Sequence, residues 1–285
     1  MKLPIALILG LSALGAAAEP ADTATVDSTK TFIFTDVINI PSTSVKDQNK
    51  SGTCWCFAGT SFYEDEIRKN GGDSLDLSEM FTVRNCYRDK AERFVRMYGQ
   101  TNFAAGGSAL DVPYVWKRYG AVPEEVYSGL QYGEDKHVHG ELDAVLAAYL
   151  KEIVKKPNKK LSKAWMKGIE GILDAYLGPV PETFEYKGKT YTPKTFAESL
   201  PLNPDDYVPL TSFMHHPYYE AFAVEVPDNW LWEKYYNVPL DELKAIVDNS
   251  LAKGHTIVWA ADVSEGGFKW NKGVALMPKG KSESD

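Results

Sequence analysis

The order of helical and extended patterns along the chain constrains its fold more than any single residue does. Helical amphipathic periods dominate the first half, at 55–69, 79–98 and 142–177, where apolar residues recur about every three or four positions. After Gly178 the chain changes to proline, tyrosine and short apolar runs, which suit hairpins and loops. Helices first and strands later, without regular alternation, predict an α+β fold.

Capping and stop signals set the bounds of the individual elements. The first helix, Trp55 to Lys69, meets a stop at Asn70-Gly71-Gly72, and the next helix follows Ser78, a favoured N-cap residue. The buried face of the first helix is predicted at positions 55, 57, 58, 62 and 67. The predicted elements are helices at 55–69, 79–98, 109–119, 142–154, 161–177 and 240–252, hairpin strands at 183–186 and 190–191, and strands at 255–261 and 273–277.

Length, charge and cysteine count exclude several classes of protein. With 285 residues, 44% of them hydrophobic, the chain can bury a substantial core, and its net charge is −8 without a basic run interleaved with aromatics. A nucleic-acid partner is therefore not expected. The only cysteines, Cys54, Cys56 and Cys86, are too few for a disulfide scaffold and lack the spacing of a zinc site. Cys56 is interpreted as a small core residue in preference to a disulfide partner.

The first residues have the pattern of an export signal. Lys2 precedes the apolar run from Leu3 to Leu14, and small residues at 16–18 offer a cleavage site before Glu19. The alternative, a membrane anchor, needs a longer apolar run. We therefore expect a signal peptide at 1–18, an exported linker at 19–30, a folded domain at 31–285, no membrane attachment after cleavage, and a periplasmic or extracellular location.

One short segment carries the residues with catalytic chemistry. Cys54 stands at the predicted start of the first helix, where the helix dipole and free backbone N–H groups favour a thiolate. Gln48, six residues earlier, is placed to donate its amide to a developing oxyanion together with the Cys54 backbone, and Trp55 would form a wall of the site. On chemistry alone, a buried structural cysteine is the commoner role for a single Cys.

The residues around Cys54 favour a catalytic role for it over a structural one. Gln48, five intervening residues, then Cys54 and Trp55 followed by an aromatic and an alanine resemble the nucleophile segment of papain-like cysteine peptidases. In that family the cysteine attacks the carbonyl and the glutamine supports the oxyanion. Ser51 stands where papain has a disulfide cysteine, and Thr53 replaces a Ser or Ala. Neither departure removes a chemical role.

The resemblance continues downstream. Leu77-Ser78-Glu79 followed by Cys86 is similar to the second-helix motif of the family, and Gly106-Gly107 is similar to the paired glycines whose backbone receives an extended substrate. Glycine allows such an approach because no Cβ intervenes. A plain helix-start turn capped by Ser108 explains the same residues equally well without the resemblance.

The length between two matched segments indicates the branch of the family. Residues 124–237 form a long, partly helical insertion between Tyr119-Gly120-Ala121-Val122-Pro123 and the helix at 240. This arrangement resembles the bleomycin hydrolase and aminopeptidase C branch. The resemblance implies a papain-like fold with a helical first half, a helical insertion and an incomplete β-rich second half. It also implies an aminopeptidase for peptides or unfolded chains, a homo-hexamer in the full-length form, and no metal or organic cofactor.

Papain-like chemistry also requires a histidine and an orienting Asn or Asp. The five histidines, His137, His139, His215, His216 and His255, do not match the catalytic position in the family order. The catalytic His and Asn are therefore expected beyond Asp285. Two alternatives remain, a catalytically inactive peptide-binding relative and an exported structural domain. A metal site at His215-His216 is not expected, because adjacent histidines point apart on a strand or helix.

Overall fold

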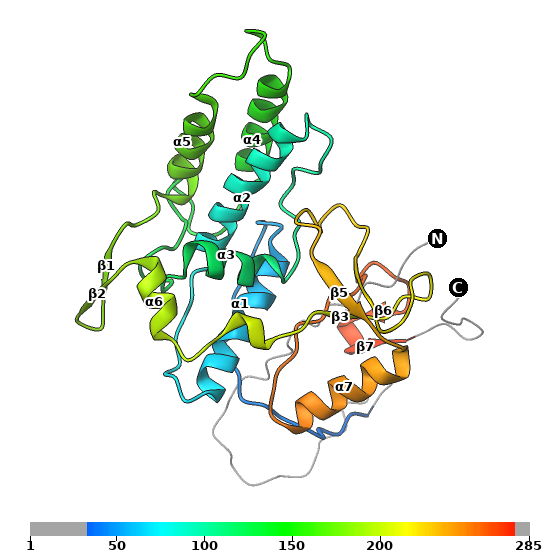
Figure 1. The fold of residues 1–285 in the computed structure, drawn as a ribbon. Helices are drawn as coiled ribbons and strands as arrows, with labels where there is room; N and C mark the ends of the chain where they lie inside the picture. Colours follow the sequence, from blue (N-terminus) through cyan, green and yellow to red (C-terminus); the bar gives the residue numbers. More distant parts are fainter. Residues whose placement is uncertain (1–32, 277–285) are drawn as a thin grey trace.

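The computed structural model describes residues 33–276, in which six helices and the β1–β2 hairpin gather on one side and the β3–β5–β4 sheet, the β6–β7 pair and α7 lie on the other (Figure 1). The expected signal peptide and linker lie outside these residues. The helices are α1 Cys54–Lys69, α2 Glu79–Arg96, α3 Asp111–Tyr119, α4 Gly140–Val154, α5 Trp165–Leu177, α6 Pro193–Ser199 and α7 Leu240–Ala252, and the strands are β1 Phe184–Tyr186, β2 Lys189–Tyr191, β3 Leu210–Thr211, β4 Ala221–Ala223, β5 Lys234–Asn237, β6 Phe268–Lys269 and β7 Val274–Ala275. The α+β prediction is confirmed.

The helical part is built on an α1, α2 and α3 core with an α4–α5 hairpin beside it (Figure 1). Ser78 caps α2, accepting a hydrogen bond on its Oγ from the Phe81 backbone N–H at 3.0 Å. Helices α4 and α5 bury apolar residues spaced four positions apart, a spacing that places them on one face of each helix. These residues are Leu142, Leu146 and Leu150 on α4 and Trp165, Ile169, Leu173 and Leu177 on α5. Across residues 33–276, no helix is both long and apolar enough to cross a bilayer.

The second part contains the three-stranded sheet and the β6–β7 pair, whereas the β1–β2 hairpin packs beside α6 in the helical part (Figure 1). Strand β5 is central, parallel to β3 and antiparallel to β4, while β1–β2 and β6–β7 form antiparallel pairs. The predicted hairpin at 183–191 and the helix at 240–252 are confirmed. The predicted strand at 255–261 is wrong, because residues 255–259 form no ladder, and Trp259 is 45% exposed. An apolar run becomes a strand only where a neighbouring strand supplies backbone partners.

Three consecutive acidic residues on α1 are buried, which the helical pattern did not predict. Glu64, Asp65 and Glu66 lie on the inner side of α1, whereas the predicted core positions 57, 58 and 62 are only half-buried. The carboxylates are satisfied by distant side chains: Ser42 Oγ donates to Asp65, Thr43 Oγ1 donates to Glu64, and Tyr207 OH donates to Glu66. Such partners make burial of the acids tolerable.

Lys46 connects the segment before α1 to the second half of α1 and to the start of α2. Its Nζ lies 2.8 Å from Glu64 Oε1 and 3.6 Å from Glu79 Oε1, and it also contacts Asp76. The side chains of Glu64 and Glu79 are 0% and 4% exposed, so Lys46 is the cation that compensates both buried carboxyls. This cluster fixes the segment that leads to Gln48 and Cys54.

The same cluster makes stability depend on pH. Burial raises the pKa of Glu79 from 4.5 to about 8, although Lys46 lowers it, and Glu64 and Glu124 raise it further. The folded chain thus keeps a proton that the unfolded chain releases above 4.5. This bound proton stabilises the folded state fully below pH 4.5, and the stabilisation is lost as the pH rises towards 8. Burial raises the pKa of Glu124 to about 7 and that of Asp111 to about 6, in the same direction.

We therefore expect the melting temperature to fall as the pH rises from about 5 to about 8. Glu79→Gln should remove part of that fall, because the other two carboxyls still titrate. Circular dichroism melts of both proteins across this range measure the effect. An equal fall in the two proteins would mean that Glu79 is not the group that keeps its proton.

Candidate active site

Cys54 is the first residue of α1, and its side chain is exposed. Thr53 precedes the helix, and its carbonyl accepts the backbone N–H of Cys56 at 2.9 Å. The first N–H groups of a helix have no intrahelical partner, so they are available to an anionic group at this end. The predicted position of Cys54 at a helix N-terminus, reachable from solvent, is thus observed.

The turn before Cys54 is compact and held by its own side chains. The Gln48 backbone carbonyl accepts the Ser51 backbone N–H at 3.2 Å, and the Ser51 and Thr53 hydroxyl oxygens are 2.6 Å apart. Gly52 has a φ of +70°, and a Cβ there would lie 2.9 Å from the Ala105 Cβ, so glycine is required. The two departures from papain therefore form one hydrogen-bonded pair. Gln48 is half-buried, and its Oε1 has no hydrogen-bond partner.

Trp55 joins the start of α1 to the segment that carries the glycine pair. It is 3% exposed, and its Nε1 donates to the Ala105 carbonyl at 2.9 Å. Lys90, on α2, donates from Nζ to the carbonyls of Ala104 and Gly106, and lies 5.5 Å from the Trp55 ring centroid. Trp55 is thus an anchor that holds residues 104–106 beside Cys54, and not only a wall.

The two predicted substrate-binding glycines have different surroundings. A Cβ on Gly107 would lie 2.5 Å from Asp111 Oδ2 and 2.8 Å from Trp55 Cε2, so packing alone requires this glycine. A Cβ on Gly106 would lie 2.5 Å from Asp228 Oδ2, which belongs to an exposed side chain. The sequence reasoning missed Asp228, because it lies far along the chain with no motif to mark it.

The alternative role for the glycines, a turn capped by Ser108, is only partly observed. Ser108 Oγ accepts the Leu110 backbone N–H at 3.1 Å, but α3 begins at Asp111 with Leu110 at the N-cap. The Ser108 hydroxyl also lies 2.7 Å from the Tyr235 hydroxyl on β5. Ser108 therefore ties this segment to the β-rich part of the fold.

Asp111 is a buried carboxylate under the glycine pair. Its Oδ2 accepts the Trp230 Nε1–H at 2.8 Å. Burial raises the pKa of Asp111 to about 6, although the Lys90 ammonium and the Trp230 hydrogen bond lower it. Asp111 is therefore part of the support for the Gly107 segment, with Trp230 arriving from the insertion.

The described histidines lie away from the Cys54 thiol or face other groups. His255 Nδ1 is 2.8 Å from Glu66 Oε2, and Glu66 is twelve residues along α1, roughly 18 Å from Cys54 by helix rise. His137 is nearer: its ring centroid is 6.1 Å from that of Phe57, and its carbonyl accepts the Lys50 backbone N–H. Its Nδ1 is buried without a hydrogen-bond partner, and burial lowers its pKa.

The other two cysteines are free and buried within the helical core. Cys56 is 0% exposed and Cys86 1%, and the Cys56 Sγ donates to the Glu79 carbonyl at 3.3 Å. Cys56 is thus a small core residue, as predicted. Burial raises the pKa of both thiols well above the ordinary range.

Residues 73–277 match the profile of the Peptidase C1-like family, which is more than half of the chain. The chain belongs to this family. The match includes Gly106, Gly107 and Asp228 but starts after Gln48 and Cys54, so the roles of those two residues depend on the local pattern and geometry.

Two curated proteins similar to this chain are both named Aminopeptidase C. The chain is 24% identical to Aminopeptidase C of Listeria monocytogenes over 79% of this chain and 60% of the relative. It is 21% identical to Aminopeptidase C of Streptococcus thermophilus over 82% of this chain and 62% of the relative. The crystal structure of PepW from Lactobacillus rhamnosis HN001 aligns with a TM-score of 0.60 at 22% identity, over 78% of this chain and 59% of that one, and shows the shared fold. The chain thus spans about 60% of the length of these relatives.

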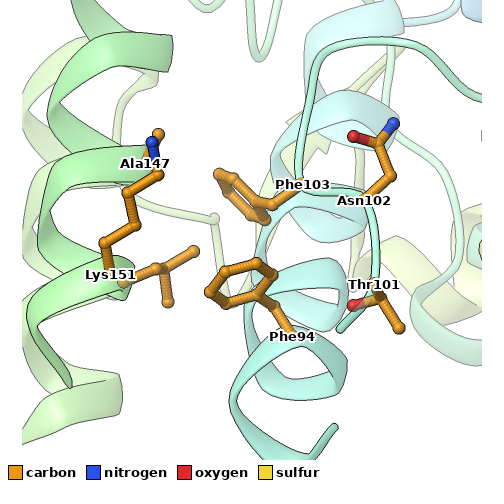
Figure 2. Close-up of a pocket in the computed structure, with 7 residues that line it drawn as sticks. Phe94, Thr101, Asn102, Phe103, Ala147 and Lys151 are labelled. Carbon is orange, nitrogen blue, oxygen red and sulfur yellow. The ribbon is translucent and has the colours of Figure 1, made fainter. Parts of the chain in front are cut away.

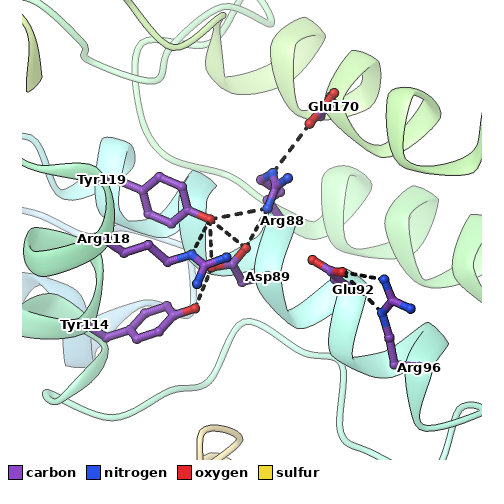
Figure 3. Close-up of polar contacts among 8 residues, drawn as sticks. All are labelled: Arg88, Asp89, Glu92, Arg96, Tyr114, Arg118, Tyr119 and Glu170. Atoms are coloured by element: carbon purple, nitrogen blue, oxygen red, sulfur yellow. Dashed lines mark hydrogen bonds and ion pairs between the residues drawn. The ribbon is translucent and has the colours of Figure 1, made fainter.

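A dense polar network joins α2 to α3 in this Peptidase C1-like chain (Figure 3). Asp89 accepts hydrogen bonds from the Tyr114 and Tyr119 hydroxyls at 2.6 and 2.8 Å and from Arg88 Nη1 at 2.8 Å. Arg118 Nε also lies 3.3 Å from Asp89 Oδ2. Asp89 is buried with its acceptor positions occupied, so we assign it a structural role.

A hollow of about 230 Å³ lies between α4 and the segment that follows α2 (Figure 2). Phe94 and Phe103 face Ala147 and Lys151 across it, and the full lining is Phe94, Thr101, Asn102, Phe103, Ala147, Leu150 and Lys151. None of the predicted catalytic or substrate-binding residues lines it. We therefore assign it no part in peptidase chemistry.

Proposed function

We propose that the chain acts as a cysteine-type peptidase, with Cys54 as nucleophile and the amino end of peptides as substrate. The observation that carries the proposal is the position of Cys54 at the exposed start of α1, beside the 105–107 segment that Trp55 holds. An exposed thiol, free helix N–H groups and a neighbouring backbone segment are what an extended peptide needs for attack at one carbonyl.

The chemistry follows the acyl-enzyme sequence. The Cys54 sulfur forms a bond to the carbonyl carbon while the C=O electron pair moves to oxygen, where the Cys54 backbone N–H and Gln48 amide stabilise it. Re-forming the C=O breaks the C–N bond, and the amine leaves with the proton that the Cys54 thiol gave up when it became a thiolate. Water then cleaves the thioester, releasing the acid and restoring the thiol.

Asp228 supports action at an amino end. Its exposed carboxylate lies against Gly106 and accepts a hydrogen bond from Asn102 Nδ2 at 3.3 Å. A peptide that follows the glycine segment would bring its terminal ammonium to this anion. A charge-assisted hydrogen bond of this kind contributes about 1.5–3 kcal/mol, roughly tenfold or more in binding.

A catalytically inactive peptide-binding role is the second candidate. It is favoured by one observation: none of the histidines within residues 33–276 forms a hydrogen bond or ion pair with Cys54, and His255 and His216 bind carboxylates instead. Such a protein would keep the thiol and the Gly106 surface but would not release the amine.

A dipeptidyl chloromethyl ketone tests the proposal, because its chemistry needs a nucleophile but no leaving amine. We expect one adduct, on Cys54, formed about tenfold faster with a free α-amine than with an N-acetylated probe. Asp228→Asn should abolish that preference, while Asp135→Asn, a change at another exposed aspartate, should keep it. Peptide mapping by mass spectrometry gives site and rate.

The outcomes separate the two parts of the proposal. Absence of an adduct on Cys54 contradicts the nucleophile. An adduct formed equally fast with both probes contradicts only the amino-end preference. An adduct on Cys54 together with reversible binding of peptides, and no release of amine from a peptide substrate, supports the inactive relative.

A further inference from the structure

Two adjacent histidines and a glutamate converge on the β-rich part of the fold. His216 Nε2 lies 2.7 Å from Glu225 Oε1, and His215 Nε2 lies 3.7 Å from Glu225 Oε2. One nitrogen or oxygen from each of the three residues falls within 4.8 Å of the others. The chain therefore presents two imidazole nitrogens and a carboxylate at one point.

The expectation that these histidines point apart is wrong, because they do not lie in a strand or helix. Residues 214–216 form a turn, in which neighbouring side chains can face the same way, and the two ring centroids are 4.5 Å apart. The alternation that separates adjacent side chains holds only in extended strands. The matching carboxylate comes from Glu225, just after β4.

A buried amide fixes the turn. Asn237, on β5 and 0% exposed, accepts the Phe213 backbone N–H at 2.8 Å and donates to the carbonyls of Phe213, His216 and Pro217 at 2.9 to 3.1 Å. These contacts hold both ends of the histidine turn against the central strand. Ordering the turn therefore adds little entropy cost to the binding of a ligand there.

An aromatic contact fixes one imidazole. The His216 ring stacks on Phe222 of β4, with centroids 3.7 Å apart and planes at 19°. Because β4 also leads to Glu225, the same strand sets the positions of His216 and the carboxylate. The histidine and glutamate side chains are 26% to 52% exposed, which leaves the open side of the cluster to solvent.

The donor set fits zinc better than the hard cations. Zinc takes imidazole nitrogen and carboxylate oxygen at about 2.0–2.2 Å, which places tetrahedral ligands roughly 3.3 Å apart. The observed separations of 2.7 and 3.7 Å lie on either side of that value. Mg²⁺ and Ca²⁺ prefer oxygen ligands and would gain little from two imidazoles.

We propose that His215, His216 and Glu225 form a binding site for Zn²⁺ or a similar borderline divalent metal ion, with solvent water completing the coordination. The ion would join the 213–217 turn to the end of β4. The site is separate from Cys54 chemistry and does not depend on the proposed function.

Calorimetric titration with ZnCl₂ tests the site in the full chain. The Cys54→Ala protein is used, because an exposed thiol also binds zinc and the other two cysteines are buried. We expect one equivalent bound with a micromolar dissociation constant, an increase in melting temperature, and no effect of MgCl₂. Glu225→Gln and His216→Ala should each weaken binding at least about tenfold.

His255→Gln is the matched control, since that histidine pairs with Glu66 elsewhere, and its zinc affinity should be unchanged. Glu225 is exposed, so its substitution tests the site even if His216→Ala disturbs folding. Absence of stoichiometric binding would overturn the proposal. Equal zinc affinity of the parent and Glu225→Gln proteins would also overturn it.

Discussion

Iodoacetamide is expected to modify Cys54 at least about 100-fold faster than Cys56 or Cys86 in the folded protein. Cys54 is exposed at the start of α1, whereas the other two thiols are almost fully buried. Burial also raises the pKa of Cys56 and Cys86, so both remain thiols near neutral pH. Their alkylation has to wait for local unfolding of the helical core.

Timed alkylation followed by peptide mapping measures the three rates. In denaturant all three cysteines should react at similar rates, which shows that the difference comes from the fold. His255→Ala should not change the Cys54 rate, because His255 contacts the far end of α1. Folded-state labelling of Cys56 as fast as that of Cys54 would refute the placement of these residues.

Replacing Lys46 with methionine is expected to lower the free energy of unfolding by about 3 kcal/mol. Methionine keeps much of the apolar length of the side chain but removes the cation. Glu64, whose side chain is fully buried, would then lose the cation that contacts it, while Glu79 beside it keeps its proton at neutral pH. Removal of one partner from a buried charge cluster is costly because the remaining charge stays desolvated.

Lys244→Met is the matched control, since Lys244 pairs with Asp248 on the surface of α7 and is 73% exposed. An exposed pair of this kind contributes little to stability, because solvent screens the two charges. Urea unfolding at neutral pH compares the two variants. Equal losses in both would show that Lys46 is not part of a buried cluster.

Local patterns predicted the longer helices but missed α6, and they did not predict which side chains the folded chain buries. The bounds of α1 and α7 follow from a helical period and glycine stop signals, and both agree with the structure. The burial of Glu64, Asp65 and Glu66 does not follow, because their partners come from distant segments such as Ser42 and Tyr207. A periodic pattern records hydrophobicity and cannot register a polar group that is satisfied by a remote partner.

The candidate site, like the fold, was predicted only where a local motif marks its residues. The sequence placed Cys54 at a helix start and Gly106-Gly107 near it, since both belong to recognisable local motifs. It missed Asp228, whose contact with Gly106 depends on how the insertion returns to the helical part, and it missed the meeting of His215 with Glu225, which depends on the path of the chain around β4. The signal-peptide and hexamer expectations remain predictions.

Covalent trapping with the free-amine dipeptidyl chloromethyl ketone tests the central claim most directly, namely that Cys54 is a peptidase nucleophile supported by Gln48. The account predicts a single adduct on Cys54, lost in Cys54→Ala and formed about tenfold or more slowly in Gln48→Ala, because the amide stabilises charge on the carbonyl oxygen. Modification of another residue, or an unchanged rate in Gln48→Ala, would contradict it.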